Sequence, residues 1–182
     1  MEWLDIVDEM GNPTGEIVER TKAHREGIWH RTSHVWVARK KKNQIEVLLQ
    51  KRSADKDSYP GCYDTSSAGH IPAGDGYEES AIRELKEELG VTATKEELHF
   101  CGQRTIYHDE EFYGEMFIDR QISNVYYLWR DMEAEEFVIQ KEELESVRWM
   151  ELNECIHMVE HQTEKTCVAL EEILMVKNTI CP

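Results

Sequence analysis

The chain has 182 residues and a formal net charge of −16, with 40% hydrophobic and 32% charged residues. This composition is typical of a soluble globular protein, and the length suits one domain better than two. The excess of acid argues against a nucleic acid polymer as a partner, because affinity for a phosphate backbone depends on neutralisation by Lys and Arg. A small phosphorylated substrate is still compatible with this charge, since a bound metal ion can reverse the local field.

The chain carries no signal for a membrane or for export. It has no run of 18 apolar residues, and its first residues, MEWLDIVDEMG, lack the basic and apolar regions of a secretory signal. The five cysteines are odd in number and scattered, without a CxxC pair, which indicates reduced thiols. We therefore expect a cytoplasmic protein without a membrane partner.

Strands are predicted for much of the first 68 residues. They are expected at residues 3–8, 16–20, 30–38, 45–50 and 65–68, and a turn rich in Gly, Asn and Pro separates the first two. The side chains of the third strand are expected to alternate between its two faces. Val35 and Val37 would lie on one face, and the other face would carry His30, Thr32, His34 and Trp36.

Residues 69–91, GHIPAGDGYEESAIRELKEELGV, are predicted to form a loop followed by a helix. Asp75 is a candidate N-cap, with Glu78 three residues later closing a capping box. Gly90 followed by Val91 suits a left-handed C-terminal cap. The helix is therefore marked at both ends.

One edge of this helix carries Glu84, Glu87 and Glu88, which share a face because they are three and four residues apart. Like charges at this spacing repel by about 0.2–0.5 kcal/mol per pair in an isolated helix. A divalent cation would turn that repulsion into ligation, since hard cations take oxygen ligands. Arg83 lies beside this edge and is expected to hold one glutamate by a bidentate pair. Acidic helix faces are also common without an ion, so the three glutamates alone do not establish a metal site.

The second half of the chain mixes strands and helices. Strands are expected at residues 98–108, 122–130 and 147–150, with an acidic mobile loop at 108–111 and a turn or short helix at 140–145. Helices are expected at 152–160 and 163–177, the last with an apolar stripe formed by Cys167, Leu170, Ile173 and Leu174. No linker or repeat divides the chain, so we predict one domain, residues 1–182, of the α/β (α+β) class with a mixed sheet between helices.

The spacing of residues 69–91 resembles the Nudix box, Gx5Ex7REUxEExGU, in which U is aliphatic. Gly69 is followed after five residues by Asp75 and after seven more by RELKEELGV, residues 83–91. The box has Glu where this chain has Asp75. The resemblance implies a Nudix-type α/β/α sandwich. It also implies Mg²⁺ (or Mn²⁺) held by Glu84, Glu87, Glu88 and the carbonyl of Gly69, with Arg83 in the catalytic set.

The chemistry expected from such a site is hydrolysis of a diphosphate linkage in a nucleoside diphosphate joined to another group, X. The metal would neutralise phosphate oxygens and lower the pKa of the attacking water. Lys51 and Arg52, at the end of a predicted strand, are candidate phosphate contacts. The general base is left open between a box glutamate and a loop acid, either Glu115 or Asp119. Four aromatic residues are candidates for stacking a base, namely Trp29, Trp36, Tyr59 and Tyr113.

Sequences around the box are similar to a narrower group, the Nudix proteins that resemble isopentenyl diphosphate isomerase. The resemblance rests on LDIVDEMGNPTGEIVER, on Trp29-His30 and on residues 63–70, YDTSSAGH. It implies a candidate second metal site at His24, His30 and His70. The isomerases need a cysteine where this chain has Ala68, and a downstream glutamate where it has Asp119 and Gln121. An amide cannot exchange a proton in this way, so isomerase activity is the disfavoured alternative.

A second alternative is a catalytically silent Nudix domain that only binds a nucleotide, because a fold does not dictate a function. A binding-only domain would be free to lose Glu84, Glu87 or Glu88, and all three are present. Catalysis is therefore favoured. The sequence leaves a homodimer open, and it assigns no role to His34, His99, His157 or His161.

Overall fold

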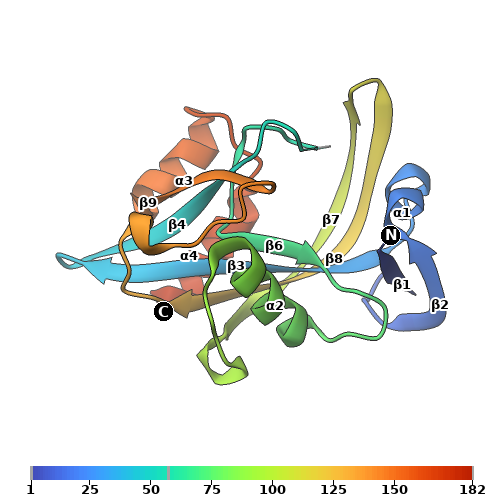
Figure 1. Cartoon of the computed structure of the whole chain (residues 1–182), viewed down its shortest axis with the longest axis horizontal. Helices are drawn as coiled ribbons and strands as arrows, with labels where there is room; N and C mark the ends of the chain where they lie inside the picture. Colours follow the sequence, from blue (N-terminus) through green and yellow to red (C-terminus); the bar gives the residue numbers. More distant parts are fainter. Residues whose placement is uncertain (1, 57, 182) are drawn as a thin grey trace.

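The computed structural model describes residues 2–56 and 58–181, and its centre is a seven-stranded mixed sheet. The main path of the sheet is β5-β4-β3-β8-β7, with β6 paired to β3 and β9 paired to β4 (Figure 1). Its strands are β3 (His30–Lys41), β4 (Gln44–Arg52), β5 (Tyr63–Asp64), β6 (Ser67–His70), β7 (His99–Phe112), β8 (Glu115–Trp129) and β9 (Leu144–Glu151).

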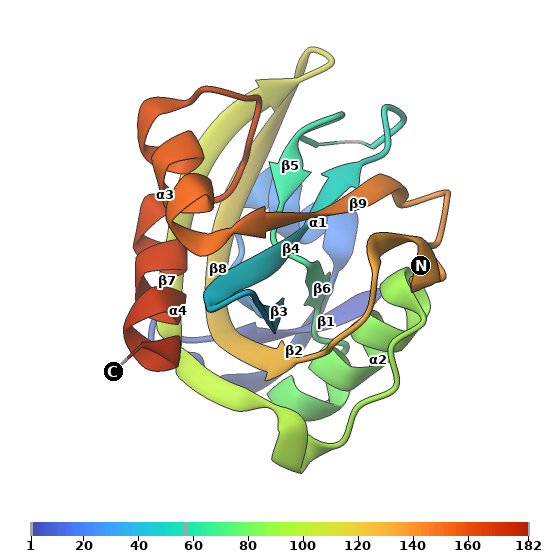
Figure 2. The ribbon, with the colours of Figure 1, turned by 90° about the vertical axis from the view of Figure 1, so that its left-hand side faces the viewer.

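Helices cover both faces of this sheet. Helix α2 (Tyr77–Leu89) lies on one face, and α3 (Leu152–His161) with α4 (Leu170–Ile180) lies on the other (Figure 2). Alternation along β3 divides the core, because Val35 and Val37 pack toward α2 while Trp36 packs toward α3 and α4. The predicted mixed sheet between helices is therefore confirmed. Two short 3-10 helices, Lys95–Glu97 and Ala134–Glu136, lie in the connections.

The core beneath α2 makes a direct stability prediction. Leu85 is fully buried there, so Leu85→Ala is expected to lower the free energy of unfolding by about 2–5 kcal/mol, since it leaves a cavity without disturbing the helix. The matched control is Leu174→Ala on α4, where the leucine is 38% exposed. Urea unfolding of both variants measures the difference. Equal losses would contradict this division between core and surface.

The N-terminal segment adds a small unit beside the main sheet. Strands β1 (Trp3–Val7) and β2 (Pro13–Glu19) form a separate hairpin and are followed by α1 (Arg20–Glu26). This seven-residue helix was not predicted, because its only buried residues are Ala23 and His24. It packs against β8, and a Cβ at the Gly27 cap would lie 2.7 Å from the Ile118 side chain. The helix thereby carries His24 toward the main sheet.

The acidic segment 108–111 is not a mobile loop, and that prediction was wrong. These residues continue β7, which pairs with β8 up to a two-residue turn at Tyr113 and Gly114, both with positive φ. Cross-strand charges hold the pairing, since Arg120 Nη1 lies 2.6 Å from Asp109 Oδ1. The β7–β8 hairpin projects beyond the rest of the sheet (Figure 1).

The last helix begins at Leu170, seven residues later than predicted. Residues 163–169 instead run extended beside β5, where the Tyr63 N–H donates to the Lys165 carbonyl and the Cys167 N–H donates to the Tyr63 carbonyl. These long-range bonds take the backbone groups that a helix would use. Ile173 and Val176 face the core as an amphipathic helix requires. Within the described residues, every helix is too short or too polar to cross a membrane.

Candidate active site

A cleft of about 1390 Å³ opens along the edge of β6. One wall comes from the C-terminal half of α2. The other walls come from β3, β4, Lys56, residues 58–60, Cys62, the β7–β8 hairpin and the start of α4. Residues from both halves of the chain therefore meet in one concave site, which is where ligands bind in most proteins.

The three glutamates of the predicted set all line this cleft. Glu88 is only 7% exposed, and its Oε2 accepts a hydrogen bond of 3.3 Å from the Ala68 N–H on β6. The Glu84 side chain is 19% exposed and Glu87 is exposed. The structure thus brings these three carboxylates together at one edge, where Glu87 is exposed, Glu84 is partly buried and Glu88 is buried.

Gly69 is where α2 and β6 approach most closely. A Cβ on this residue would collide with the Glu84 carboxyl group and lie 2.7 Å from its Oε1. Only glycine leaves room for that carboxylate against the strand. The Gly69 backbone is therefore adjacent to the glutamate set, as the resemblance implied.

The charges at this edge are poorly compensated. Burial raises the pKa of Glu88 to about 8, and the neighbouring Glu84 contributes, although the nearby Ser67 hydroxyl and the Ala68 N–H oppose the shift. Burial also raises the pKa of Glu84, against the pull of Arg83. Carboxylates that are costly to ionise without a cation form a fitting oxygen donor set for Mg²⁺ or Mn²⁺.

Arg83 forms ion pairs with two carboxylates of the site. Its Nη2 donates to Glu84 Oε1 at 3.0 Å, and its Nη1 donates to Asp75 Oδ2 at 3.0 Å. The predicted capping role of Asp75 was wrong, because α2 has Gly76 as its N-cap and no side-chain cap in the described chain. The carboxylate of Asp75 is used by Arg83 instead. The predicted left-handed C-cap at Gly90 is confirmed.

His24, His30 and His70 also meet, and one ligand atom from each lies within 4.8 Å of the others. His24 Nε2 is 3.0 Å from His70 Nε2, and the His24 Nδ1 is 2.9 Å from Asp119 Oδ1. The buried His30 Nε2 has no hydrogen-bond partner in residues 2–56 and 58–181. Burial lowers the pKa of His30 to about 4, so this ring is neutral, as metal ligation requires. This donor set fits a second cation, whose presence stays a prediction.

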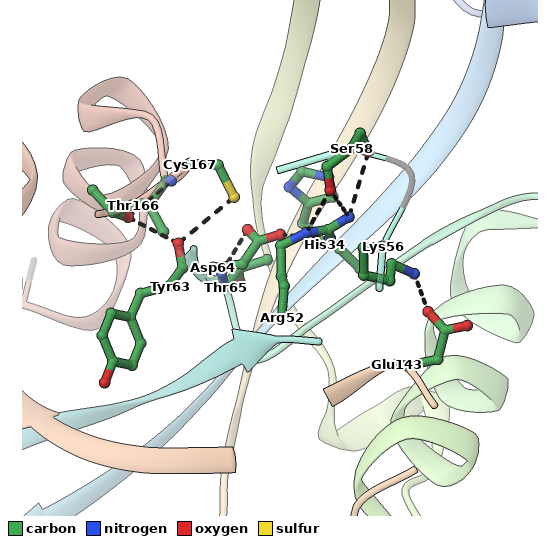
Figure 3. A network of polar contacts seen from close by, with 12 residues as sticks. His34, Arg52, Lys56, Ser58, Tyr63, Asp64, Thr65, Glu143, Thr166 and Cys167 are labelled. Carbon is green, nitrogen blue, oxygen red and sulfur yellow. Dashed lines mark hydrogen bonds and ion pairs between the residues drawn. The ribbon is translucent and has the colours of Figure 1, made fainter. Parts of the chain in front are cut away.

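The two residues predicted to contact phosphate, Lys51 and Arg52, lie in different places. Arg52 lines the cleft, where its Nη2 donates to the Ser58 carbonyl at 2.9 Å and its Nη1 lies 3.2 Å from Asp64 Oδ2 (Figure 3). Lys51 is not among the described lining residues and pairs with Glu145 at 2.8 Å. Lys56, which the sequence did not single out, is a further cation of the cleft and pairs with Glu143 (Figure 3).

The aromatic candidates also differ in position. Trp36 is fully buried, and its Nε1 donates to Glu172 at 2.9 Å, so the prediction that it stacks a base was wrong. Tyr59 lines the cleft and contacts Phe112, with ring centroids 4.8 Å apart. Trp29 packs near Tyr107 outside the described lining. Tyr113 lies at the hairpin turn and is 74% exposed.

Glu115 and Asp119 were expected on a loop, and that was wrong, because both lie on β8. Asp119 lines the cleft and Glu115 is outside its described lining. Asp119 is 8% exposed and accepts a hydrogen bond of 2.8 Å from Gln121 Nε2. Gln121 in turn accepts from Thr32 at 3.3 Å. Sequence reasoning missed the charged group of His34, Arg104 and Glu172 in the same cleft. No sequence signal joins residues that lie on β3, β7 and α4.

A family model described as the NUDIX domain matches residues 29–168. The chain belongs to the Nudix family. It is 39% identical over 156 residues to Nudix hydrolase 3 of Arabidopsis thaliana, covering 84% of this chain and 20% of that protein. The chain therefore spans about a fifth of the length of that plant relative. It is also 34% identical over 163 residues to an uncharacterised Nudix hydrolase of Clostridium acetobutylicum, covering 90% of this chain and 76% of that protein.

The fold agrees with the family. A crystal structure of a Deinococcus radiodurans protein superposes with a TM-score of 0.68 at 20% identity, covering 97% of this chain and 98% of the other. An isopentenyl-diphosphate Delta-isomerase of Cereibacter sphaeroides is 26% identical over 152 residues, covering 81% of this chain and 78% of that protein. The Nudix resemblance expected from residues 69–91, including an isomerase-like relative, is thereby confirmed.

Proposed function

We propose that this Nudix domain hydrolyses the diphosphate linkage of a nucleoside diphosphate joined to a group X, or of a similar small organic pyrophosphate, with Mg²⁺ (or Mn²⁺). The observation that carries the proposal is the convergence of Glu84, Glu87 and Glu88 beside Gly69, at the edge of a cleft that also holds Arg52. An anhydride substrate needs both features, because its phosphates bind cations and its reacting water needs activation.

In this proposal Glu84, Glu87, Glu88 and the Gly69 carbonyl hold the ion. The bound ion supplies neutralisation of phosphate oxygens and a water of lowered pKa. Arg83 keeps the Glu84 carboxylate turned toward the cleft through the 3.0 Å bond between them. Arg52 and Lys56 line the same cleft and would contact the phosphates.

Isomerase chemistry is not proposed, because two groups it needs are replaced. Ala68 has no proton to give, and the Gln121 amide is bonded to both Thr32 and Asp119. Asp119 is a candidate general base, but its contact with His24 makes it equally suited to orient a histidine at the second metal site.

A substrate panel tests the proposed reaction. The full chain is incubated with nucleotide sugars, dinucleoside polyphosphates, nucleoside triphosphates and isopentenyl diphosphate, with Mg²⁺ or with EDTA, and the products are quantified. We expect Mg²⁺-dependent cleavage of at least one nucleoside diphosphate derivative and no isomer of isopentenyl diphosphate. Cleavage of none of them would contradict the hydrolase proposal. Formation of the prenyl isomer would support the alternative.

Expectations for the partner, the location and the oligomeric state accompany this proposal. The net charge of −16 argues against a nucleic acid polymer as a partner, and a small phosphorylated partner is compatible with it once a cation is bound. A cytoplasmic location is supported by five cysteines that are free thiols. A homodimer is one candidate for the oligomeric state, and gel filtration with light scattering determines the mass directly.

A further inference from the structure

A buried charge cluster lies in the cleft on the α4 side of the sheet, and the proposed hydrolysis does not use it. Glu172 of α4 has a side chain only 3% exposed, and it accepts hydrogen bonds from three groups of the sheet. These are His34 Nδ1 at 3.0 Å, Trp36 Nε1 at 2.9 Å and Arg104 Nη1. A carboxylate held by three donors from two strands is a fixed anchor.

The hydrogen bond to Glu172 fixes the orientation of the His34 ring. The side chain of His34 is 15% exposed and lines the cleft, while its Nδ1 is turned to the buried Glu172. The ring edge that carries Nε2 is therefore left for the cleft. Within the described part of the chain Nε2 has no hydrogen-bond partner, nor is it a buried unpaired atom. A carboxylate that orients an imidazole in this way leaves the second nitrogen for a ligand.

The charge of this ring follows from its neighbours. Burial works against a positive His34, but the attraction and hydrogen bond of Glu172 outweigh it, with Asp64 adding to the effect, and the pKa of His34 is raised. Arg104 opposes the shift, and Arg52 is paired with Asp64 beside it. Glu172 remains ionised, because His34 and Arg104 overcome its burial and lower its pKa to about 2. The raised pKa favours the ring that is protonated on both nitrogens, in which Nε2 is a hydrogen-bond donor.

An apolar group placed against this wall would be poorly accommodated. Covering a charged donor without giving it an acceptor costs the full desolvation penalty of that group. An oxyanion supplies that acceptor, and Arg104 and Arg52 offset the carboxylates Glu171, Glu172 and Asp64 of the same group. The wall thus selects for a charged oxygen.

We propose that His34 contacts the substrate, and that its Nε2 binds an oxyanion carried by the group X beyond the diphosphate. A phosphate and a carboxylate share this chemistry. The inference rests on the proposed function only in that the diphosphate occupies the glutamate edge of the same cleft. It narrows X to an acidic group and makes His34, held by Glu172, a determinant of specificity.

Matched ligand pairs test the subsite without turnover. Binding to the full chain is measured by calorimetry in EDTA for UDP-glucuronate against UDP-glucose, which differ by a carboxylate on X, and for ADP-ribose 1″-phosphate against ADP-ribose, which differ by a phosphate on X. We expect the acidic member of at least one pair to bind about tenfold tighter, the strength of one charged hydrogen bond. The pair that discriminates identifies the oxyanion. Equal binding within both pairs, or no binding at all, overturns the proposal.

Two further measurements assign the preference to His34. In His34→Gln the preference is expected to fall to about twofold or less, whereas the exposed His157→Gln on α3, outside the described lining, should keep it. In wild type, histidine side-chain ¹H–¹⁵N spectra should show His34 Nε2 shifting with the acidic ligand alone, which needs no variant to fold. An unmoved Nε2 resonance, or a preference retained in His34→Gln, overturns the proposal. Hydrolysis without discrimination would refute this subsite alone, and discrimination without hydrolysis would refute the proposed reaction alone.

Discussion

Glu88→Gln is expected to reduce Mg²⁺-dependent hydrolysis by about 10²–10³-fold, the loss typical when a group that stabilises transition-state charge is removed. Glu88 lies at the buried end of the glutamate set, with its Oε2 held by the Ala68 N–H. The amide keeps the shape and that hydrogen bond but offers the cation no charge. Initial rates with the substrate found in the panel, at saturating Mg²⁺, measure the effect.

The same substitution is expected to stabilise the metal-free protein at high pH. Burial, with Glu84 adding to it, raises the pKa of Glu88 to about 8 from an ordinary value of 4.5, so the folded protein keeps a proton that the unfolded chain has released. This contribution to stability is complete below about pH 4.5 and is lost as pH rises through about 8. A shift of this size corresponds to a few kcal/mol, at about 1.4 kcal/mol per pKa unit. Glu88→Gln does not ionise and avoids the loss.

Urea unfolding in EDTA at pH 6 and pH 9 checks this second effect. The difference in unfolding free energy between the two pH values should be smaller in Glu88→Gln than in wild type. The matched control is Glu78→Gln on the outer face of α2, where the side chain is 47% exposed and pairs with Lys95 at 3.7 Å. It should change neither the rate nor the pH dependence. A Glu88→Gln enzyme with wild-type turnover would remove Glu88 from the reaction.

Gly69→Ala is expected to lower turnover by about 10²-fold, the loss that a displacement of about 1 Å produces at a catalytic group. The new methyl group would occupy the space of the Glu84 carboxyl, whose Oε1 would lie 2.7 Å away. Glu84 must then move, and its 3.0 Å bond to Arg83 moves with it. The displaced side chain can move toward the open cleft, so the fold should persist and thermal unfolding should change little.

Gly15→Ala is the matched control for this glycine substitution. Gly15 lies in β2 with φ of +91°, and nothing lies within 4 Å of an added Cβ. Alanine there costs about 1 kcal/mol in stability through its left-handed backbone and should leave activity unchanged. The two variants are therefore expected to show opposite profiles in kcat and in thermal unfolding. Full activity of Gly69→Ala would show that the position of Glu84 is not critical.

The elements that were predicted correctly have strong local patterns. Helix α2 follows from its period of 3.6 residues and its Gly90 cap, and β3 follows from alternation around Val35 and Val37. The errors arise where long-range contacts override local preference. The acidic end of β7 is a strand because it pairs with β8, and residues 163–169 stay extended because they bond to Tyr63.

By itself the sequence determined the Nudix family, the mixed sheet between helices and the glutamate face of α2, because each follows from the spacing of residues that are close together in the chain. Only the tertiary structure decided which charges share the cleft. It placed Arg52 inside, left Lys51 outside, and joined His34 to Glu172 although 138 positions separate them. The physical reason is that contact between distant residues depends on how strands and helices pack, and a side chain carries no local signal of the partner it will meet.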